Sequence, residues 1–164
     1  MLRKLFVTPN DCTLTIARVV LAVIFFAHGS QKMFGLFGGR GFSGTIDLFQ
    51  QTMGIPAALT VCAMVAEVCG SIGLFLGLLS RVAASGVLVV MLVAVPANGL
   101  YPHFFMNWTG AQRGEGFEYH LLAVALILTI LVRGGGCFSL DRAIAARQQT
   151  APGSDAHAVR RAAG

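Results

Sequence analysis

Six ionisable side chains lie in or beside strongly apolar stretches of this sequence. A charged group at the centre of a bilayer costs about 2.5 to 3.5 kcal/mol on insertion scales, so such residues usually face the inside of a helix bundle and find partners. Histidine exchanges protons near neutral pH, because its reference pKa is about 6.5. The set therefore has the chemistry for ion pairing and proton exchange, and its members are Arg18, His28, Lys32, Glu67, Glu118 and His120.

Helical spacing places three of these side chains on one face of the first apolar stretch. At about 100° per residue, Arg18, His28 and Lys32 fall within an arc of roughly 80°. The rise along each helix puts Glu67 at a depth between His28 and Arg18. We therefore predict that Glu67 pairs with Arg18 or His28. By the same count, Glu118 pairs with Lys32.

Four apolar stretches must position these residues. A membrane-spanning helix needs roughly 20 mainly apolar residues; residues 12–34, 56–79 and 82–100 meet this length, and residues 119–132 do so when extended at both ends. The chain is 55% hydrophobic and only 12% charged, whereas a soluble domain is about a quarter charged. These features predict an all-α integral membrane protein built as a four-helix bundle.

The bundle accounts for most of the chain. We assign residues 1–11 to a short cytoplasmic lead, residues 12–147 to the membrane domain with a short cytoplasmic C-terminal helix that Ser139 caps, and residues 148–164 to a disordered tail. The loop at residues 35–55 carries apolar residues at three- and four-residue spacing. This spacing fits a short amphipathic helix on the outer face, and an apolar loop packed over the bundle explains it equally well.

The basic residues set the predicted orientation. They gather before the first stretch, in the tight loop at Arg81 and after the fourth stretch, so the positive-inside rule puts both termini in the cytoplasm. Attraction to anionic lipid also accounts for the net charge of +5 without a nucleic-acid partner.

The four cysteines show no disulfide framework and no metal-binding spacing. Cys12 and Cys137 are predicted near the cytoplasmic ends of helices, and Cys62 and Cys69 lie within the second apolar stretch. We expect no metal site. The sequence also shows no glycine pattern for a flavin and no haem-attachment motif, so an electron donor would be a partner protein or a thiol.

Four stretches together carry a family pattern: "ARVVLAVIFFAHGSQKMFG" (17–35), "AEVCGSIGLFLGLLSR" (66–81), "GFEYHLLAVALIL" (116–128) and "GGGCFSLDR" (134–142). They resemble the DoxX family of small bacterial membrane proteins. The resemblance implies a four-helix inner-membrane protein linked to redox chemistry. Relatives include the DoxD-type subunit of thiosulfate:quinone oxidoreductase, and others are described as membrane partners of superoxide dismutase and a sulfurtransferase in defence against oxidative stress.

The leading interpretation is a membrane component of a redox system, such as a quinone- or thiol-linked oxidoreductase subunit. A quinone would enter between helices near the outer half of the bundle. The candidate catalytic residues are His28, Lys32 and Glu67, and the candidate ligand-binding or ion-pair residues are Arg18, Glu118 and His120.

Three alternatives stay open. The chain would be a non-enzymatic scaffold if the segment at 134–142 and the basic tail anchor a soluble redox partner at the cytoplasmic face. A small-molecule carrier of four helices without a repeat would have to work as a homo-oligomer. Finally, buried ion pairs can serve only to fix helix register.

Overall fold

A computed structural model describes residues 3–97, 103–111 and 114–150. All regular secondary structure in these residues is helical, as the sequence predicted. The elements in chain order are α1 (Arg3–Phe6), α2 (Cys12–Phe34), the 3-10 helix η1 (Leu36–Gly38), α3 (Gly41–Met53), α4 (Ala57–Leu76), α5 (Ser80–Ala97), α6 (Glu118–Arg133) and α7 (Leu140–Thr150).

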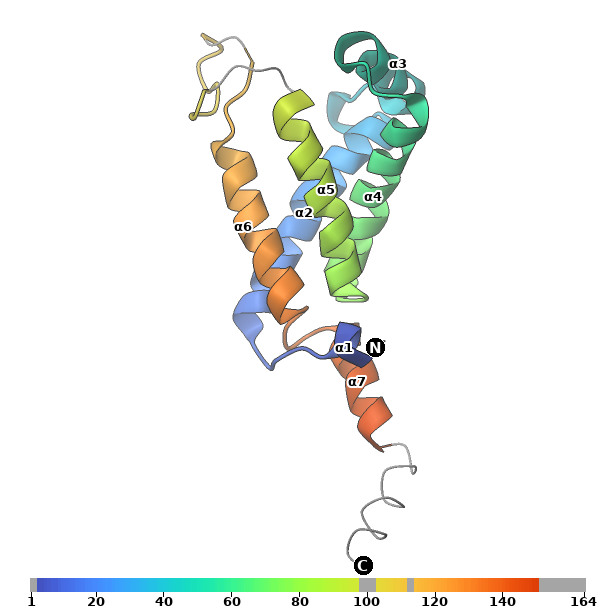
Figure 1. Cartoon of the computed structure of the whole chain (residues 1–164), viewed down its shortest axis with the longest axis vertical. Helices are drawn as coiled ribbons and strands as arrows, with labels where there is room; N and C mark the ends of the chain where they lie inside the picture. Colours follow the sequence, from blue (N-terminus) through green and yellow to red (C-terminus); the bar gives the residue numbers. More distant parts are fainter. Residues whose placement is uncertain (1–2, 98–102, 112–113, 151–164) are drawn as a thin grey trace, which may run out of the picture.

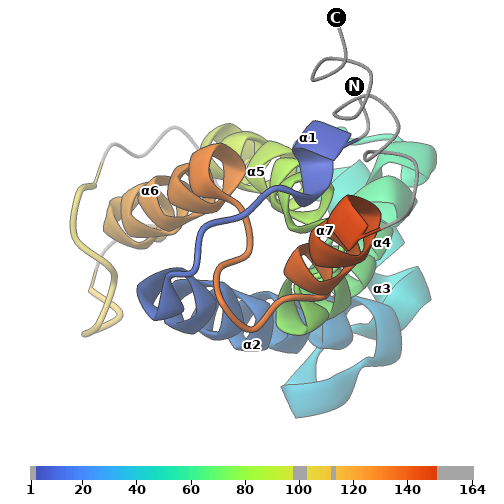
Figure 2. The same cartoon turned by 90° about the horizontal axis from the view of Figure 1, so that it is seen from below.

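The long helices α2, α4, α5 and α6 pack around one core (Figures 1 and 2). Helix α2 contacts α4 and α6, and α5 contacts α4 and α6. In Figure 1, α2 runs obliquely behind the other three helices, from the foot of α6 towards α3. The core is filled by apolar side chains that include Leu21, Phe25, Leu74, Val87 and Ile127. We call the end that carries α1 and α7 the lower end, as Figure 1 is drawn.

The outer surface of these helices is largely apolar, and two of their charged side chains are buried. Ile16, Leu122 and Val132 are 66%, 68% and 74% exposed, whereas Arg18 and Glu67 are each 1% exposed. Large apolar side chains on the outward face of each long helix fit a lipid solvent better than water. By length and composition, α2 and α4 can each cross a membrane, and the apolar part of α5, Ser80–Pro96, is shorter.

Several predicted elements are confirmed. Helix α3 forms in the 35–55 loop and packs against α2 and α4. The fourth apolar stretch gains one residue at each end in α6, which has 16 residues and therefore stays shorter than the predicted spanning length of roughly 20. The oxygen of Ser139 accepts a hydrogen bond from the Arg142 amide at 3.3 Å, so it caps α7 as expected. The predicted boundary of the tail at 148–164 was too early, because residues 148–150 are helical and belong to α7. Residues 151–164 lie outside the described part of the chain.

Candidate functional site

A buried ion pair joins α2 to α4. The Nζ atom of Lys32, in the last turn of α2, lies 2.5 Å from Oε1 of Glu67 in α4. The side chain of Lys32 is 27% exposed and that of Glu67 only 1%. The helices approach closely because Gly29 has no side chain: a Cβ atom there would lie 3.1 Å from Cβ of Glu67 and 2.9 Å from Cγ2 of Val68. The site thus lies where α2 and α4 pack closely together.

The predicted pairing was wrong in both halves. Glu67 pairs with Lys32 and not with Arg18 or His28, and Glu118 accepts a hydrogen bond from the Met106 amide at 3.0 Å instead of binding Lys32. The depth count assumed upright helices, whereas α2 is oblique to α4 (Figure 1). The long lysine side chain adds several ångströms of reach that a count along the backbone ignores.

His28, Tyr119 and His120 extend the polar site towards α6. The ring centroids of His28 and Tyr119 are 6.2 Å apart, and those of Tyr119 and His120 are 5.5 Å apart. His28 is near enough to interact electrostatically with both Lys32 and Glu67, and Tyr119 with Glu67. Three helices therefore contribute to one cluster, which we call the polar cluster: His28, Lys32, Glu67, Tyr119 and His120.

The polar cluster contains buried atoms whose hydrogen-bonding capacity is unused. Oε2 of Glu67 and the hydroxyl of Tyr119 have no hydrogen-bond partner among the described residues. Nδ1 of His120 is also unpartnered there, although its imidazole lies beside the Gly116 carbonyl. Because buried polar atoms are nearly always hydrogen-bonded, such a group of atoms needs an explanation. A bound polar group is one.

Arg18 belongs to a different part of the structure. Its Nε donates to the Gly135 carbonyl at 2.9 Å and its Nη2 to the Phe138 carbonyl at 2.6 Å. Its Nη1 donates to the carbonyl of Leu74 and, at 2.7 Å, to that of Phe75. The guanidinium thus caps the last turn of α4 and holds the segment between α6 and α7, which crosses the lower end in Figure 2. The sequence predicted its burial and not this structural role.

Asp141 also holds the lower end together. We call Arg18 and Asp141, with the backbone groups that they bind, the lower clamp. Its carboxylate accepts hydrogen bonds from the amides of Leu79 at 2.6 Å and Ser80 at 2.8 Å, which caps the start of α5. It also interacts electrostatically with Arg18. Gly77, in the left-handed conformation with φ 66°, lets the segment approach, since a Cβ there would lie 2.5 Å from Cβ of Ser139. The family-like stretches at 66–81 and 134–142 therefore meet in space.

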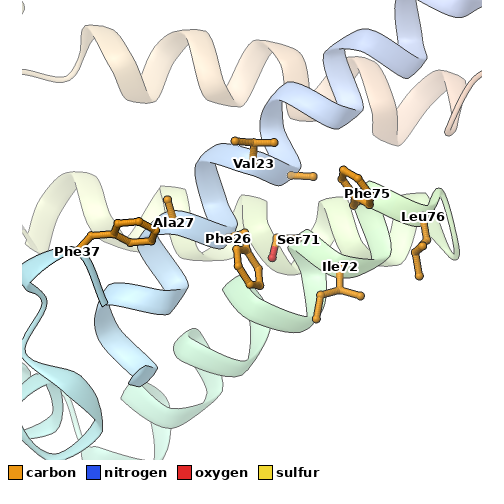
Figure 3. A pocket seen from close by; sticks show the side chains of 9 residues that line it. Val23, Phe26, Ala27, Phe37, Ser71, Ile72, Phe75 and Leu76 are labelled. Carbon is orange, nitrogen blue, oxygen red and sulfur yellow. The ribbon is translucent and has the colours of Figure 1, made fainter. Parts of the chain in front are cut away.

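An apolar pocket of about 420 Å³ opens elsewhere between α2 and α4. Figure 3 shows Phe26 and Ile72 beside it and the hydroxyl-bearing Ser71 between the helices. None of the six predicted site residues lines it. The lining residues are Ala22, Val23, Phe26, Ala27, Phe37, Ser71, Ile72, Phe75 and Leu76.

Sequence reasoning thus found four of the five residues of the polar cluster and missed Tyr119. Its position beside His120, at the start of an apolar helix, was the available signal. Arg18 and Glu118 were predicted in the same site, and the structure brings neither into it.

Comparison with known proteins identifies the family of the chain. The inner membrane protein YphA of Escherichia coli (strain K12) is 28% identical over 142 residues, which cover 84% of this chain and 94% of that protein. No solved structure matches the chain. The pattern of the DoxX family matches residues 13–108, more than half of the chain and a range that includes Arg18, His28, Lys32 and Glu67. The chain therefore belongs to the DoxX family of membrane proteins.

Proposed function

We propose that this protein is an inner-membrane component of a redox system, and that its polar cluster binds the oxygen-bearing head of a small lipid-soluble ligand such as a quinone or quinol. In this proposal α2, α4, α5 and α6 all span the bilayer, with both termini in the cytoplasm. The basic residues at the lower end and the apolar outer surface support this placement.

One observation carries the ligand proposal: Glu67 Oε2 and the Tyr119 hydroxyl are both buried and unpartnered among the described residues. Leaving a buried polar atom unsatisfied costs about 1 to 3 kcal/mol. A carboxylate oxygen accepts a hydrogen bond, and a phenol can donate one. A ligand with a hydroxyl and a carbonyl, or one that interconverts the two, satisfies both atoms.

The other members of the polar cluster have roles that fit this ligand class. Lys32 holds positive charge beside Glu67 and stabilises negative charge that develops on a nearby ligand oxygen. His28 and His120 flank Tyr119, and each neutral imidazole can donate one hydrogen bond and accept another. Electrons would come from a partner protein or a thiol.

Mass spectrometry of organic extracts from gently purified protein tests this proposal. We would compare wild type with Tyr119→Phe, Glu67→Gln and His28→Ala, and use Glu115→Gln as the matched control, since Glu115 is exposed and accepts its hydrogen bond from the Asn107 amide outside the cluster. Tyr119→Phe is the sharpest variant. It removes only a hydroxyl without a partner among the described residues, so the protein should stay folded.

Wild type and Glu115→Gln should retain a lipid-soluble ligand with paired oxygen functions, and Tyr119→Phe and Glu67→Gln should lose it while melting as folded proteins. If all variants retain only the same bulk phospholipid as wild type, the ligand proposal is overturned. The buried pair would then serve only to fix the α2–α4 register.

Removing residues 134–164 does not cleanly test the alternative of a docking scaffold. Gly135 and Phe138 accept hydrogen bonds from Arg18, and Asp141 caps α5. Deleting this segment would disturb the bundle as well as any partner surface. Point substitutions at exposed positions such as Arg147 would test partner binding instead.

A further inference from the structure

The structure brings two of the four cysteines together at the lower end. Cys12 is the first residue of α2, and Cys137 lies in the segment that connects α6 to α7. Cys12 is exposed and Cys137 partly exposed, so reagents in solution can reach them. The remaining cysteines, Cys62 and Cys69, are exposed on α4.

Backbone contacts fix the two cysteines as neighbours. The Cys137 amide donates a hydrogen bond to the carbonyl of Asp11 at 3.1 Å, and that carbonyl precedes Cys12 directly in the chain. Standard bond lengths then keep the two Cα atoms within roughly 7 Å of each other. Disulfides span Cα separations up to about 6.8 Å, so a small movement of the segment suffices to bridge them.

The side chains also interact. The Thr15 hydroxyl lies 3.5 Å from the Cys137 sulfur, and the thiols of Cys12 and Cys137 are near enough for each to affect the ionisation of the other. Partial burial raises the pKa of the Cys137 thiol, but hydrogen bonds from Cys12, from Thr15 and from the backbone at Phe138 and Cys137 outweigh it and lower the pKa below its ordinary value. A larger thiolate fraction makes this sulfur the better nucleophile of the pair.

We propose that Cys12 and Cys137 form a reversible, oxidation-sensitive dithiol that closes to a disulfide between the start of α2 and the α6–α7 segment. The inference does not depend on a ligand in the polar cluster. Neither the DoxX match nor the relative's name assigns a role to these cysteines.

The oxidant that fits an accessible thiolate is a hydroperoxide. The Cys137 thiolate attacks hydrogen peroxide, the O–O bond breaks, and the products are a sulfenic acid on Cys137 and, after protonation, one water. Cys12 then gives up its proton and attacks that sulfur. The S–S bond forms, the S–O bond breaks and a second water leaves. The two thiols lose two electrons to the peroxide, and a dithiol reductant returns them by exchange.

The disulfide would act on the lower clamp. Arg18 holds the same segment through the carbonyls of Gly135 and Phe138 on either side of Cys137. A covalent link to Cys12 would tie this segment to the first turn of α2. Oxidation would therefore stiffen the lower end, where α2, α4 and α5 meet.

The test treats the reduced, full-length protein in detergent with a small excess of hydrogen peroxide, blocks free thiols with an alkylating agent and digests without reductant. We expect a peptide containing Cys12 linked to one containing Cys137 within one chain, the loss of two alkylatable thiols, and full recovery of both after dithiothreitol. Cys62→Ser should behave as wild type.

Two variants examine the order of the steps. Cys12→Ser should stop at the sulfenic acid on Cys137, trapped by dimedone, and Cys137→Ser should leave Cys12 largely alkylatable. The proposal is overturned if the wild type yields no intrachain 12–137 link. It is also overturned if Cys62 or Cys69 is oxidised as fast as Cys137.

Discussion

Lys32 and Glu67 form an ion pair in which the two partners are buried to different extents: Nζ lies 2.5 Å from Oε1, with the lysine side chain 27% exposed and the glutamate 1% exposed. Because the acid has no access to solvent and the base does, losing one partner has different consequences on the two sides. An unpaired buried charge is strongly destabilising, whereas removing both charges of such a pair is often tolerated.

Lys32→Met should therefore destabilise the protein more than Glu67→Gln does. We expect a loss of about 3 kcal/mol in the free energy of unfolding for Lys32→Met, since it leaves Glu67 buried without its cation. The double variant should be more stable than Lys32→Met alone. Denaturant titrations in mixed micelles would measure the free energy of unfolding of wild type, both single variants and the double variant. If the two single losses simply add up in the double variant, Lys32 and Glu67 are not coupled.

Arg18→Lys should be destabilising although it keeps the charge. A lysine cannot reproduce the planar fork that reaches the carbonyls of Leu74, Phe75, Gly135 and Phe138. Losing two charged hydrogen bonds should cost about 3 kcal/mol of unfolding free energy. The matched control is Arg133→Lys, whose side chain is 55% exposed and lies 3.6 Å from Asp11, and which should change stability by less than about 1 kcal/mol. Equal effects at both positions would contradict the clamp.

Comparing Gly77→Ala with Gly54→Ala separates the cost of lost packing space from the cost of a left-handed backbone. Gly77 and Gly54 both end a helix with φ near 65°, at 66° and 65°. A Cβ at Gly77 would lie 2.5 Å from Cβ of Ser139, and at Gly54 it would meet nothing within 4 Å. Both alanine variants should lose about 1 kcal/mol from the left-handed backbone, and Gly77→Ala should lose roughly 2 kcal/mol more. Similar melting temperatures for both variants would argue against the tight contact.

Asp141 should protect the start of α5 from hydrogen exchange. Its two oxygens accept from the amides of Leu79 and Ser80, so Asp141→Ala exposes both donors and should cost about 2 kcal/mol. Asp141→Asn keeps one acceptor and should cost about half as much. Exchange mass spectrometry should show faster exchange in peptides that cover 77–82 and no change in α3. If residues 77–82 exchange hydrogen at the same rate in Asp141→Ala as in wild type, Asp141 does not cap α5.

The sequence by itself determined the long helices and the burial of Arg18 and Glu67. Apolar length defined α2, α4, α5 and α6, and the Ser139 cap marked α7, because these features depend on residues close in the chain. Membrane energetics predicted that Arg18 and Glu67 would be internal, and each is 1% exposed.

Only the tertiary structure decided the partners. Because α2 is oblique and the lysine side chain is long, Glu67 pairs with Lys32. Arg18 instead donates hydrogen bonds to backbone carbonyls at the lower end. Tyr119 entered the polar cluster through the packing of α6 on α2. Cys12 and Cys137 became neighbours because the α6–α7 segment crosses under α2. Such contacts join residues far apart in the chain, and helix rotation, tilt and loop path set them, none of which composition or periodicity encodes.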